Sequence, residues 1–518
     1  MLLRFWRTAP GAGKASIRWV RMHTSTASPK TLMDILEERN MVQATTSSAL
    51  RTHMATTKGS TLVPRTVYAG VDPSAASMHV GNLLPLLALL HCALHGHTAL
   101  VLVRAMLIQI GGGTGAIGDP SGRSTERSAL DPAQLAKNVA SIRAQMYQFF
   151  HNAAAYLERR GLRESQANQY TGDAKVGPTG EHLFTSGLDV RLVNNISWLQ
   201  PVSLIEFLTN VGRYARVNDM MARDSVKNRL TPAESEGSSA PGLSFTEFTY
   251  QLLQAYDFSV LHREPYHCSL QIGGSDQMGN ISAGIDLIRR QEASKGADIR
   301  EDPAYGLTLP LLTTANGAKL GKSAGNAVWI SPELLSDMDF YQYFLRSADA
   351  DVERFLRSLT LLPTQRIDEV LAEHDKDRSK RLAQETLAAE MTELVRGDTA
   401  LQRARVATKV LFGTRLNDLR AGDVIFAFEN DARLVHMPRQ VLGSEIIGVA
   451  ADAGLSASKS ACQTNPGEAR RLQKGGGLYL NGAPVADVRQ TLSESDLLDS
   501  RFFVLRAGKQ NHRIVVIE

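Results

Sequence analysis

The residues with the clearest chemistry lie in a short segment that begins at Tyr68. Within it, His79, Gly81 and Asn82 stand directly before an apolar run that predicts a helix. A helix start offers free backbone N–H groups and the positive end of the helix dipole, and both attract a phosphate. The segment therefore predicts a nucleotide-phosphate site, whereas a lone histidine would be better explained as a structural residue.

A second segment, about 240 residues further along, carries two ammonium groups and a hydroxyl. Lys319, Lys322 and Ser323 lie among small residues, which predicts a loop. Lysine is a flexible point charge that can follow a pyrophosphate as a loop moves. An exposed lysine-rich hairpin tip would explain part of this pattern, because Asn316-Gly317 predicts a turn. The spacing after the pair Asp276-Gln277 favours phosphate binding.

A third set of polar residues shares one face of a predicted helix. Tyr250, Gln254 and Asp257 are spaced by four and three residues, so their side chains project from the same side. Asp257 alone could equally be a surface acid. Together, the three side chains can converge on a small ligand.

The elements that must position these residues alternate along the chain. From about 66 to 120 the sequence predicts a strand, a turn, an apolar helix, a strand at 100–103 and a glycine-dense stretch. Such alternation predicts a parallel α/β sheet whose ligands sit at the carboxyl ends of the strands. Long helices are predicted over 134–162 and 198–230, followed by a flexible Ser/Pro/Gly-rich loop over 231–242.

The composition changes after about residue 332. Residues 333–437 are rich in helix formers with alternating charge, which predicts an α-helical domain. Residues 438–518 begin with a short helix and end in strands, which predicts a small α+β domain. The α/β domain is then expected over 34–332.

Residues 1–33 have a composition of their own. They contain six basic residues and no acidic one, together with Ser, Thr and scattered large apolar residues. This is typical of an amphipathic mitochondrial presequence, although a disordered basic arm that touches RNA would have the same composition. The remainder holds 51 basic and 53 acidic residues, so binding of nucleic acid must depend on local patches.

Cysteine spacing and hydropathy argue against three features: a disulfide framework, a zinc site and a membrane span. Cys92, Cys268 and Cys462 are far apart, so they predict neither a disulfide framework nor a zinc site, and they fit a reducing compartment. The apolar run 83–103 is interrupted by histidines and a glycine, so it is not expected to span a bilayer.

In this order and spacing, the segments resemble the bacterial and mitochondrial tyrosyl-tRNA synthetases, which are class I aminoacyl-tRNA synthetases. The resemblance runs from about residue 34 to the C-terminus, and its most specific part is the predicted helix 245–258. It implies a Rossmann-like catalytic domain over 34–332, an anticodon-binding-type helical domain over 333–437 and an S4-like RNA-binding domain over 438–518.

The resemblance implies a pocket for L-tyrosine. The implied tyrosine-binding residues are Tyr68, Asp119, Tyr250, Gln254, Asp257 and Gln277. Tyr68 and Asp257 would hold the phenol, because an ionised carboxylate accepts its hydrogen bond and phenylalanine would leave that carboxylate unpaired. The substrate ammonium would meet Asp119, Tyr250 and Gln254, and the remaining glutamine would lie near the substrate carboxylate.

The resemblance also implies the groups that handle ATP. The implied ATP-binding residues are Gly70, Asp72, Ser74, His79, Gly81, Asn82, Gly274, Asp276 and Lys322, and those implied in catalysis are His79, Asn82, Lys319, Lys322 and Ser323. Asp276 would take the ribose hydroxyls, whereas Asp72 and Ser74 flank the phosphate path. Arg123 and Arg127 fall where the family has a second mobile basic loop. Mg²⁺ would arrive with ATP, since the sequence predicts no protein metal cage.

The remaining implied partners are tRNA(Tyr) and a second subunit. The implied tRNA contacts are Arg470, Arg471, Lys474, Arg506 and Lys509, although a solvated charged helix would explain the first three equally well. The family works as a homodimer, so one tRNA is expected to bridge two subunits of a soluble enzyme in the mitochondrial matrix.

Two departures and two alternatives remain. Asn82 stands where the family's signature has a second histidine, and Met278 where tryptophan is usual; we expect the latter to alter packing only. Loop 231–242 is either a disordered excursion or an added RNA contact. The alternative functions are a tryptophanyl-tRNA synthetase and an RNA-binding protein that assists intron splicing.

Overall fold

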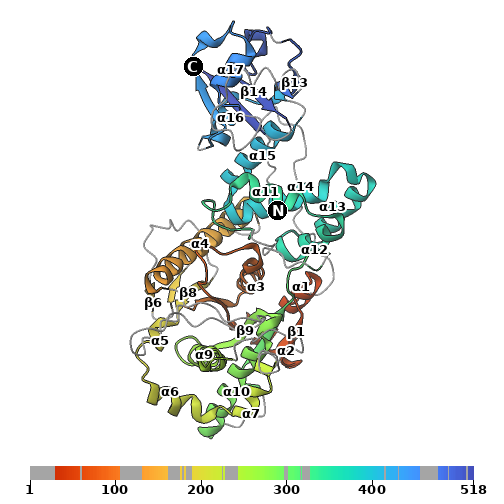
Figure 1. The fold of residues 1–518 in the computed structure, drawn as a ribbon. Coiled ribbons are helices and arrows are strands. Elements are labelled where there is room, and N and C mark those ends of the chain that lie inside the picture. The colour runs from red at the N-terminus through yellow and green to blue at the C-terminus, as the bar shows by residue number, and fades with distance from the viewer. Residues whose placement is uncertain are drawn as a thin grey trace, which may run out of the picture.

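Figure 1 shows the fold, a computed structural model, as three regions that follow one another along the molecule. A large sheet with its helices forms one end, a group of helices lies in the middle, and a small sheet forms the other end. The structure describes residues 30–58, 61–104, 131–161, 176–177, 180–182, 189–223, 226–227, 243–296, 302–315, 317, 327–413, 416–429, 431–455, 477–487, 489–508 and 511–518.

The large sheet has eight strands in the order β1-β10-β9-β4-β5-β8-β7-β6. Their bounds are β1 (Ala44–Thr45), β4 (Thr66–Val71), β5 (Thr98–Val103), β6 (Val176–Gly177), β7 (Gly180–His182), β8 (Val190–Asn194), β9 (Cys268–Gly274) and β10 (Tyr305–Leu309). Five strands, β8, β5, β4, β9 and β10 in spatial order, are parallel. Numbered by their order along the chain, they give the spatial order 3-2-1-4-5. This is the Rossmann order, whose ligands bind where the order reverses, here between β4 and β9. The predicted Rossmann-like parallel α/β fold is confirmed.

The two faces of this sheet are covered by different helices, because successive side chains of a strand point to opposite faces. Val67, Ala69 and Val71 of β4 join the core that contains helix α3 (Leu83–Leu94). Tyr68 points the other way and joins the core of α9 (Phe245–His262) and α10 (Met278–Ser294). Every second residue of β4 therefore faces the helix that carries the predicted ligand-binding residues.

Helix α9 starts and stops at residues suited to those places. Ser244 caps its first turn, since its Oγ accepts the N–H of Glu247 at 3.2 Å. The Glu247 carboxylate in turn accepts the N–H of Ser244 at 3.4 Å. This reciprocal pair is a capping box. The helix ends at His262, ahead of Pro265, which favours an end there because a proline lacks the N–H that a helix needs.

The long helix predicted over 198–230 is wrong. The chain instead forms the short helices α5 (Ile196–Leu199), α6 (Leu204–Asn210) and α7 (Val217–Met221), and the 3₁₀ turn η2 (Gly212–Tyr214). Pro201 has no N–H to continue the helix, and Ser203 starts a new helix by capping α6. The long helix predicted over 134–162 is confirmed as α4 (Pro132–Arg159).

The middle region is helical and contains no strand among its described residues before β11. Its helices are α11 (Asp337–Leu345), α12 (Asp349–Leu359), α13 (Thr364–Lys376), η4 (Arg378–Lys380), α14 (Leu382–Arg396), α15 (Asp398–Phe412), η5 (Leu416–Asp418) and α16 (Ala421–Phe428).

The elements that precede β4 in the chain, apart from β1, are α1 (Leu32–Glu38), α2 (Ala49–Met54), β2 (Thr57–Lys58) and β3 (Thr61–Leu62). In the part of the chain that is described, no helix is both long and apolar enough to span a membrane.

The small sheet has the order β11-β15-β14-β12-β13. Its elements are β11 (Leu434–Met437), η6 (Arg439–Val441), α17 (Ile446–Asp452), β12 (Leu478–Leu480), β13 (Ala483–Pro484), η7 (Glu494–Asp496), β14 (Phe502–Ala507) and β15 (Asn511–Ile517). β11 lies before the predicted boundary at residue 438, yet it pairs with β15. The division into domains at 33, 332 and 437 stays a prediction.

Candidate active site

Some of the predicted site residues lie in the described part of the chain. These are Tyr68, Gly70, Asp72, Ser74, His79, Gly81, Asn82, Tyr250, Gln254, Asp257, Gly274, Asp276, Gln277 and Arg506. Those outside the described residues are Asp119, Arg123, Arg127, Lys319, Lys322, Ser323, Arg470, Arg471, Lys474 and Lys509, together with residues 1–29 of the predicted presequence and loop 231–242.

The predicted residues meet at the point where the strand order reverses. Asp72 follows the last residue of β4, and Asp276 lies in the 3₁₀ turn η3 (Ser275–Gln277) directly after β9. Gly274 leaves room for this turn, since a Cβ there would come within 2.6 Å of Asp276 Oδ1. Two carboxylates thus flank the switch point of the sheet, where a nucleotide ribose and phosphates bind in this class of fold.

The deepest part of the site is a buried carboxylate with amide and indole partners. Asp257 on α9 is fully buried, and its Oδ1 accepts a hydrogen bond from Trp198 Nε1 at 2.9 Å. Asn195 Nδ2 donates to Asp257 Oδ2 at 3.1 Å. Tyr68 faces the same layer, with its ring centroid 5.2 Å from that of Phe258.

Two buried oxygen atoms beside Asp257 have no hydrogen-bond partner among the described residues. They are the hydroxyl of Tyr68, which is 1% exposed, and Oδ1 of Asn195, which is 0% exposed. Buried polar groups are nearly always paired, so unpaired groups beside a carboxylate indicate a place for a polar ligand.

Burial dominates the electrostatics of this end of the site. Removal from water raises the pKa of Asp257 to about 7, although hydrogen bonds from Trp198 and Asn195 and the charge of Arg104 oppose that rise. Burial, and then the charge of Asp257, raises the pKa of Tyr68 well above its ordinary value. Tyr68 is therefore a neutral hydrogen-bonding group, whereas Asp257 changes charge near neutral pH.

A second polar group lies between this carboxylate and the switch point. Tyr250 donates from its hydroxyl to Asp72 Oδ2 at 3.3 Å. Asp72 also pairs with Arg104, whose Nε lies 2.9 Å from its Oδ1. Gln254 accepts from Arg104 Nη1 at 2.5 Å and donates from Nε2 to Gln277 Oε1 at 3.3 Å. The helical spacing of Tyr250, Gln254 and Asp257 does bring them to one polar face.

Sequence reasoning missed Arg104, Asn195 and Trp198. Arg104 directly follows β5, and Asn195 directly follows β8. Residues at the carboxyl ends of parallel strands are candidates for ligand contact, which was the available signal. The neighbours of these strand ends become known only once the strand order is known.

The first predicted phosphate segment forms a helix start. Asn82 Oδ1 accepts the backbone N–H of His79 at 3.0 Å, so the asparagine caps the 3₁₀ turn η1 (Val80–Asn82) that leads into α3. Val80 donates its N–H to the carbonyl of Val328 at 3.0 Å, and Ile330 donates to the carbonyl of Met78 at 2.9 Å. The chain that follows the second lysine segment therefore runs beside the first segment.

The small sheet carries the described member of the predicted tRNA-contacting set. The Arg506 guanidinium lies 3.8 Å from the ring centroid of Tyr479 on the neighbouring strand β12. Its Nη1 donates to the Gly508 carbonyl at 3.0 Å.

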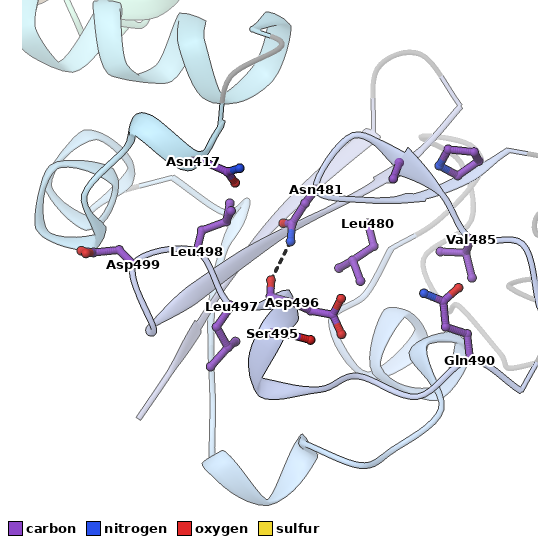
Figure 2. Close-up of a pocket in the computed structure, with 12 residues that line it drawn as sticks. Asn417, Leu480, Asn481, Val485, Gln490, Ser495, Asp496, Leu497, Leu498 and Asp499 are labelled. Carbon is purple, nitrogen blue, oxygen red and sulfur yellow. Dashed lines mark hydrogen bonds between the residues drawn. The ribbon is translucent and has the colours of Figure 1, made fainter.

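A cavity of about 370 Å³ lies in the same region, between η5 and the small sheet (Figure 2). Its two carboxylates have internal roles: Asp499 accepts the N–H of Ala421 at 2.8 Å, and Asp496 accepts that of Ser493 at 2.8 Å. Asn481 Nδ2 donates to the Asp496 carbonyl at 2.6 Å, as Figure 2 shows. None of the predicted site residues lines this cavity, so it is not the active-site candidate.

The described residues contain no group of three or more His, Cys, Asp and Glu side chains that could hold a metal ion. Cys92 and Cys268 are buried, and burial raises the pKa of the Cys92 thiol to about 12. Neither thiol is a candidate nucleophile.

A Rossmann-order sheet with polar groups converging on its switch point defines a nucleotide-dependent α/β enzyme. The family model described as tRNA synthetases class I (W and Y) matches residues 62–413. The chain belongs to this family of aminoacyl-tRNA synthetases and, within it, to the tyrosine–tRNA ligases, as the following relatives show.

Two curated relatives and one solved structure illustrate the likeness. The tyrosine–tRNA ligase of Roseiflexus castenholzii is 41% identical over 87% of this chain and 92% of its own length. The chloroplastic/mitochondrial tyrosine–tRNA ligase of Arabidopsis thaliana is 39% identical over 95% of this chain and 86% of its own. A C-terminally truncated mitochondrial tyrosyl-tRNA synthetase of Aspergillus nidulans superposes with a TM-score of 0.61 at 30% identity, covering 74% of this chain and 95% of that one.

Proposed function

We propose that the chain activates L-tyrosine with ATP to tyrosyl-adenylate and then transfers the tyrosyl group to tRNA(Tyr). The observation that carries this proposal is the buried Asp257 with, beside it, the Tyr68 hydroxyl that has no hydrogen-bond partner among the described residues. A phenol can donate to the carboxylate and accept from Tyr68, whereas the ring of phenylalanine or the indole of tryptophan offers no matching hydroxyl.

The chemistry needs positioned groups and no covalent enzyme intermediate. In the first step a carboxylate oxygen of tyrosine forms a bond to the α-phosphorus of ATP, and the bond from that phosphorus to pyrophosphate breaks. In the second, a hydroxyl of the terminal tRNA ribose attacks the tyrosyl carbonyl and AMP leaves. Fixed donors that stabilise charge on the phosphate are sufficient for such transfers. Mg²⁺ bound to ATP would add to this stabilisation.

We assign the phosphate contacts to the two signature segments. The start of α3, with the side chains of His79 and Asn82, would face the phosphates with the positive end of the helix dipole. Lys319, Lys322 and Ser323 would neutralise the pyrophosphate. The hydrogen bond between Val80 and Val328 supports this pairing, because Val328 follows Ser323 by only five residues.

We place the enzyme in the mitochondrial matrix. The basic, acid-free residues 1–33 fit a presequence. The Arabidopsis thaliana relative is named chloroplastic/mitochondrial and the Aspergillus nidulans one mitochondrial, which supports a mitochondrial location.

We further propose that the enzyme is a homodimer whose interface includes helices α6 and α7 and the start of α9. The exposed apolar side chains there are Leu204, Ile205, Leu208, Val217, Met221 and Phe245, which are six of the ten large exposed apolar side chains among the described residues. Apolar surface concentrated in one stretch favours a protein partner, and a second copy of the same surface is self-complementary.

Replacing Ile205 by aspartate is expected to convert the dimer to a monomer. This side chain is 76% exposed, so the substitution leaves the subunit core intact but places a charge in the proposed interface. The molar mass measured by light scattering after size exclusion should fall from twice the subunit mass to the mass of one subunit. Leu334→Asp, at an exposed apolar residue outside this surface, is the control and should stay dimeric. A monomeric native chain would refute the proposal.

Tyr68→Phe is expected to weaken tyrosine binding without weakening the fold. Loss of one neutral hydrogen bond to the phenol should cost about 1 kcal/mol, roughly 5-fold in Kd. The free energy of unfolding should stay the same or rise by up to about 1 kcal/mol, because the hydroxyl is buried without a described partner. Tyr156→Phe is the matched control: its hydroxyl donates to Glu390, so that variant should be destabilised. Equal destabilisation of both variants would contradict the phenol role.

Aminoacylation of tRNA(Tyr) tests the whole proposal. Purified residues 30–518, which keep helix α1 and its cap, should charge this tRNA with tyrosine, and tryptophan and phenylalanine should give no product. Charging of a tryptophan tRNA would instead favour the alternative amino acid. Replacing Arg506 by glutamine is expected to lower the charging rate at limiting tRNA, because it removes one positive charge from the proposed tRNA contacts.

A further inference from the structure

Arg104 lies between Asp72 and Gln254, two residues of the candidate active site. It directly follows β5, and its side chain is 8% exposed. Its Nε lies 2.9 Å from Asp72 Oδ1, and its Nη1 donates to Gln254 Oε1 at 2.5 Å. The guanidinium therefore joins the switch point of the sheet to helix α9.

The backbone leaves space for this guanidinium. A Cβ on Gly70 would come within 2.8 Å of Arg104 Nε and 3.0 Å of its Cζ. Any larger residue at position 70 would have to push the guanidinium away. Because both contacts and this space depend on β4 and α9, the arginine occupies a defined place and is not a loose surface side chain.

The groups around Arg104 are arranged for a cation. Gln254 directs its oxygen at Arg104 and Asn280, and it donates from Nε2 to Gln277 Oε1 at 3.3 Å. The Tyr250 hydroxyl donates to Asp72, whose carboxylate faces the guanidinium. An amide oxygen and a carboxylate thus converge on one positive charge, at the place where the ammonium of tyrosine would find its acceptors.

We propose that Arg104 competes with the substrate ammonium for the side-chain oxygen of Gln254. Tyrosine then binds by displacing the guanidinium from Gln254. The inference rests on the proposed function. Two positive charges about 3 Å apart in a poorly solvated pocket repel strongly, so the oxygen of Gln254 serves one of them at a time. Because Nε holds Asp72 and Nη1 holds Gln254, a rotation of the guanidinium can release Gln254 while the ion pair stays.

Competition of this kind lowers the apparent affinity for ligands that carry an ammonium. The observed Kd is the intrinsic Kd divided by the fraction of molecules in which the place is open. If Arg104 holds Gln254 in roughly nine molecules of ten, removal of its charge should tighten binding about 10-fold.

The test measures calorimetric binding of three compounds to the full chain and to Arg104→Met. L-tyrosine carries both an ammonium and a carboxylate, tyrosinol carries only the ammonium, and 3-(4-hydroxyphenyl)propionate carries only the carboxylate. In the variant, tyrosine and tyrosinol should bind about 10-fold more tightly, whereas the propionate should bind no more tightly than before. Arg191→Met is the matched control, because it removes an arginine from the same sheet that pairs with Asp189 at 2.6 Å. It should change none of the three constants.

Other outcomes overturn the inference. Weaker binding of tyrosine and the propionate with tyrosinol unchanged would mean that Arg104 binds the substrate carboxylate. If the Kd of each of the three compounds is the same for Arg104→Met as for the wild type, Arg104 has no part in binding. If Arg104→Met does not fold, Arg104→Lys replaces it: one ammonium cannot make both contacts, so tyrosinol should bind about 3-fold more tightly, and unchanged binding overturns the inference. A wild-type chain that binds none of the three compounds would contradict the proposed function itself.

Discussion

Asp257→Asn is expected to lower kcat/KM for tyrosine activation by at least about 100-fold, which corresponds to roughly 3 kcal/mol for the loss of a charged hydrogen bond in a buried site. The carboxylate is fully buried and held by Trp198 and Asn195, so it cannot be replaced by a neighbouring acid or by water. The amide keeps the shape of the side chain but not its charge. Steady-state activation kinetics with tyrosine and with phenylalanine measure the effect.

The ratio between the two amino acids separates this role from a structural one. Activation of phenylalanine, already poor, should change little, so the preference for tyrosine should shrink. Asp286→Asn on the neighbouring helix α10 is the control, because that carboxylate is 44% exposed, and it should leave the ratio unchanged. A preference for tyrosine that survives Asp257→Asn would remove this residue from the phenol site.

The pH dependence of tyrosine binding provides an independent readout of the same carboxylate. Burial raises the pKa of Asp257 to about 7, so the ionised acceptor is present above that pH and is lost below it. Tyrosine affinity should therefore fall as the pH drops from 8 to 6, and the Asn variant should show no such fall. For folding the sign is opposite: a raised pKa stabilises the native state at low pH, and that contribution disappears as the pH rises through about 7.

Arg160→Met is expected to lower the free energy of unfolding by about 3–5 kcal/mol. Arg160 Nη2 lies 2.9 Å from Glu390 and 2.7 Å from Glu393, both on α14. Glu390 is 2% exposed and Glu393 is 9% exposed. Removing the guanidinium takes the ion-pair partner from the buried Glu390 and leaves Glu393 with Arg159 alone, at 2.8 Å. Arg160 directly follows α4, which lies beside the large sheet, whereas α14 belongs to the helical region. The ion pairs therefore connect the two regions. Urea unfolding followed by fluorescence measures the loss.

A surface arginine provides the control for this stability prediction. Arg378 pairs with Asp375 at 2.8 Å, and both side chains are about 60% exposed. Exposed pairs contribute little, so Arg378→Met should leave the unfolding midpoint within experimental error. Similar losses from both variants would show that the buried cluster contributes nothing beyond a surface pair.

Local patterns were sufficient to predict much of the catalytic fold. The apolar helix after Asn82 and the strand before Arg104 were recognisable because the first is a long apolar run and the second a short one rich in β-branched residues. The spacing of Tyr250, Gln254 and Asp257 placed them on one helical face without any tertiary information.

The errors arose where tertiary context decides. The 198–230 stretch has helical composition, yet Pro201 and the cap at Ser203 divide it into short helices that expose apolar surface. Asn195 and Arg104 lie about 60 and 150 residues from their partners Asp257 and Gln254. Only the strand order brings such distant residues together, and no local pattern encodes that order.

The central claim is that the buried carboxylate pocket selects tyrosine for reaction with ATP. ATP–pyrophosphate exchange by purified residues 30–518, with tyrosine, tryptophan or phenylalanine as the only amino acid, tests it most directly. We predict exchange that depends on tyrosine and is lost in Asp257→Asn. Exchange driven by tryptophan, or by no amino acid at all, would contradict the claim.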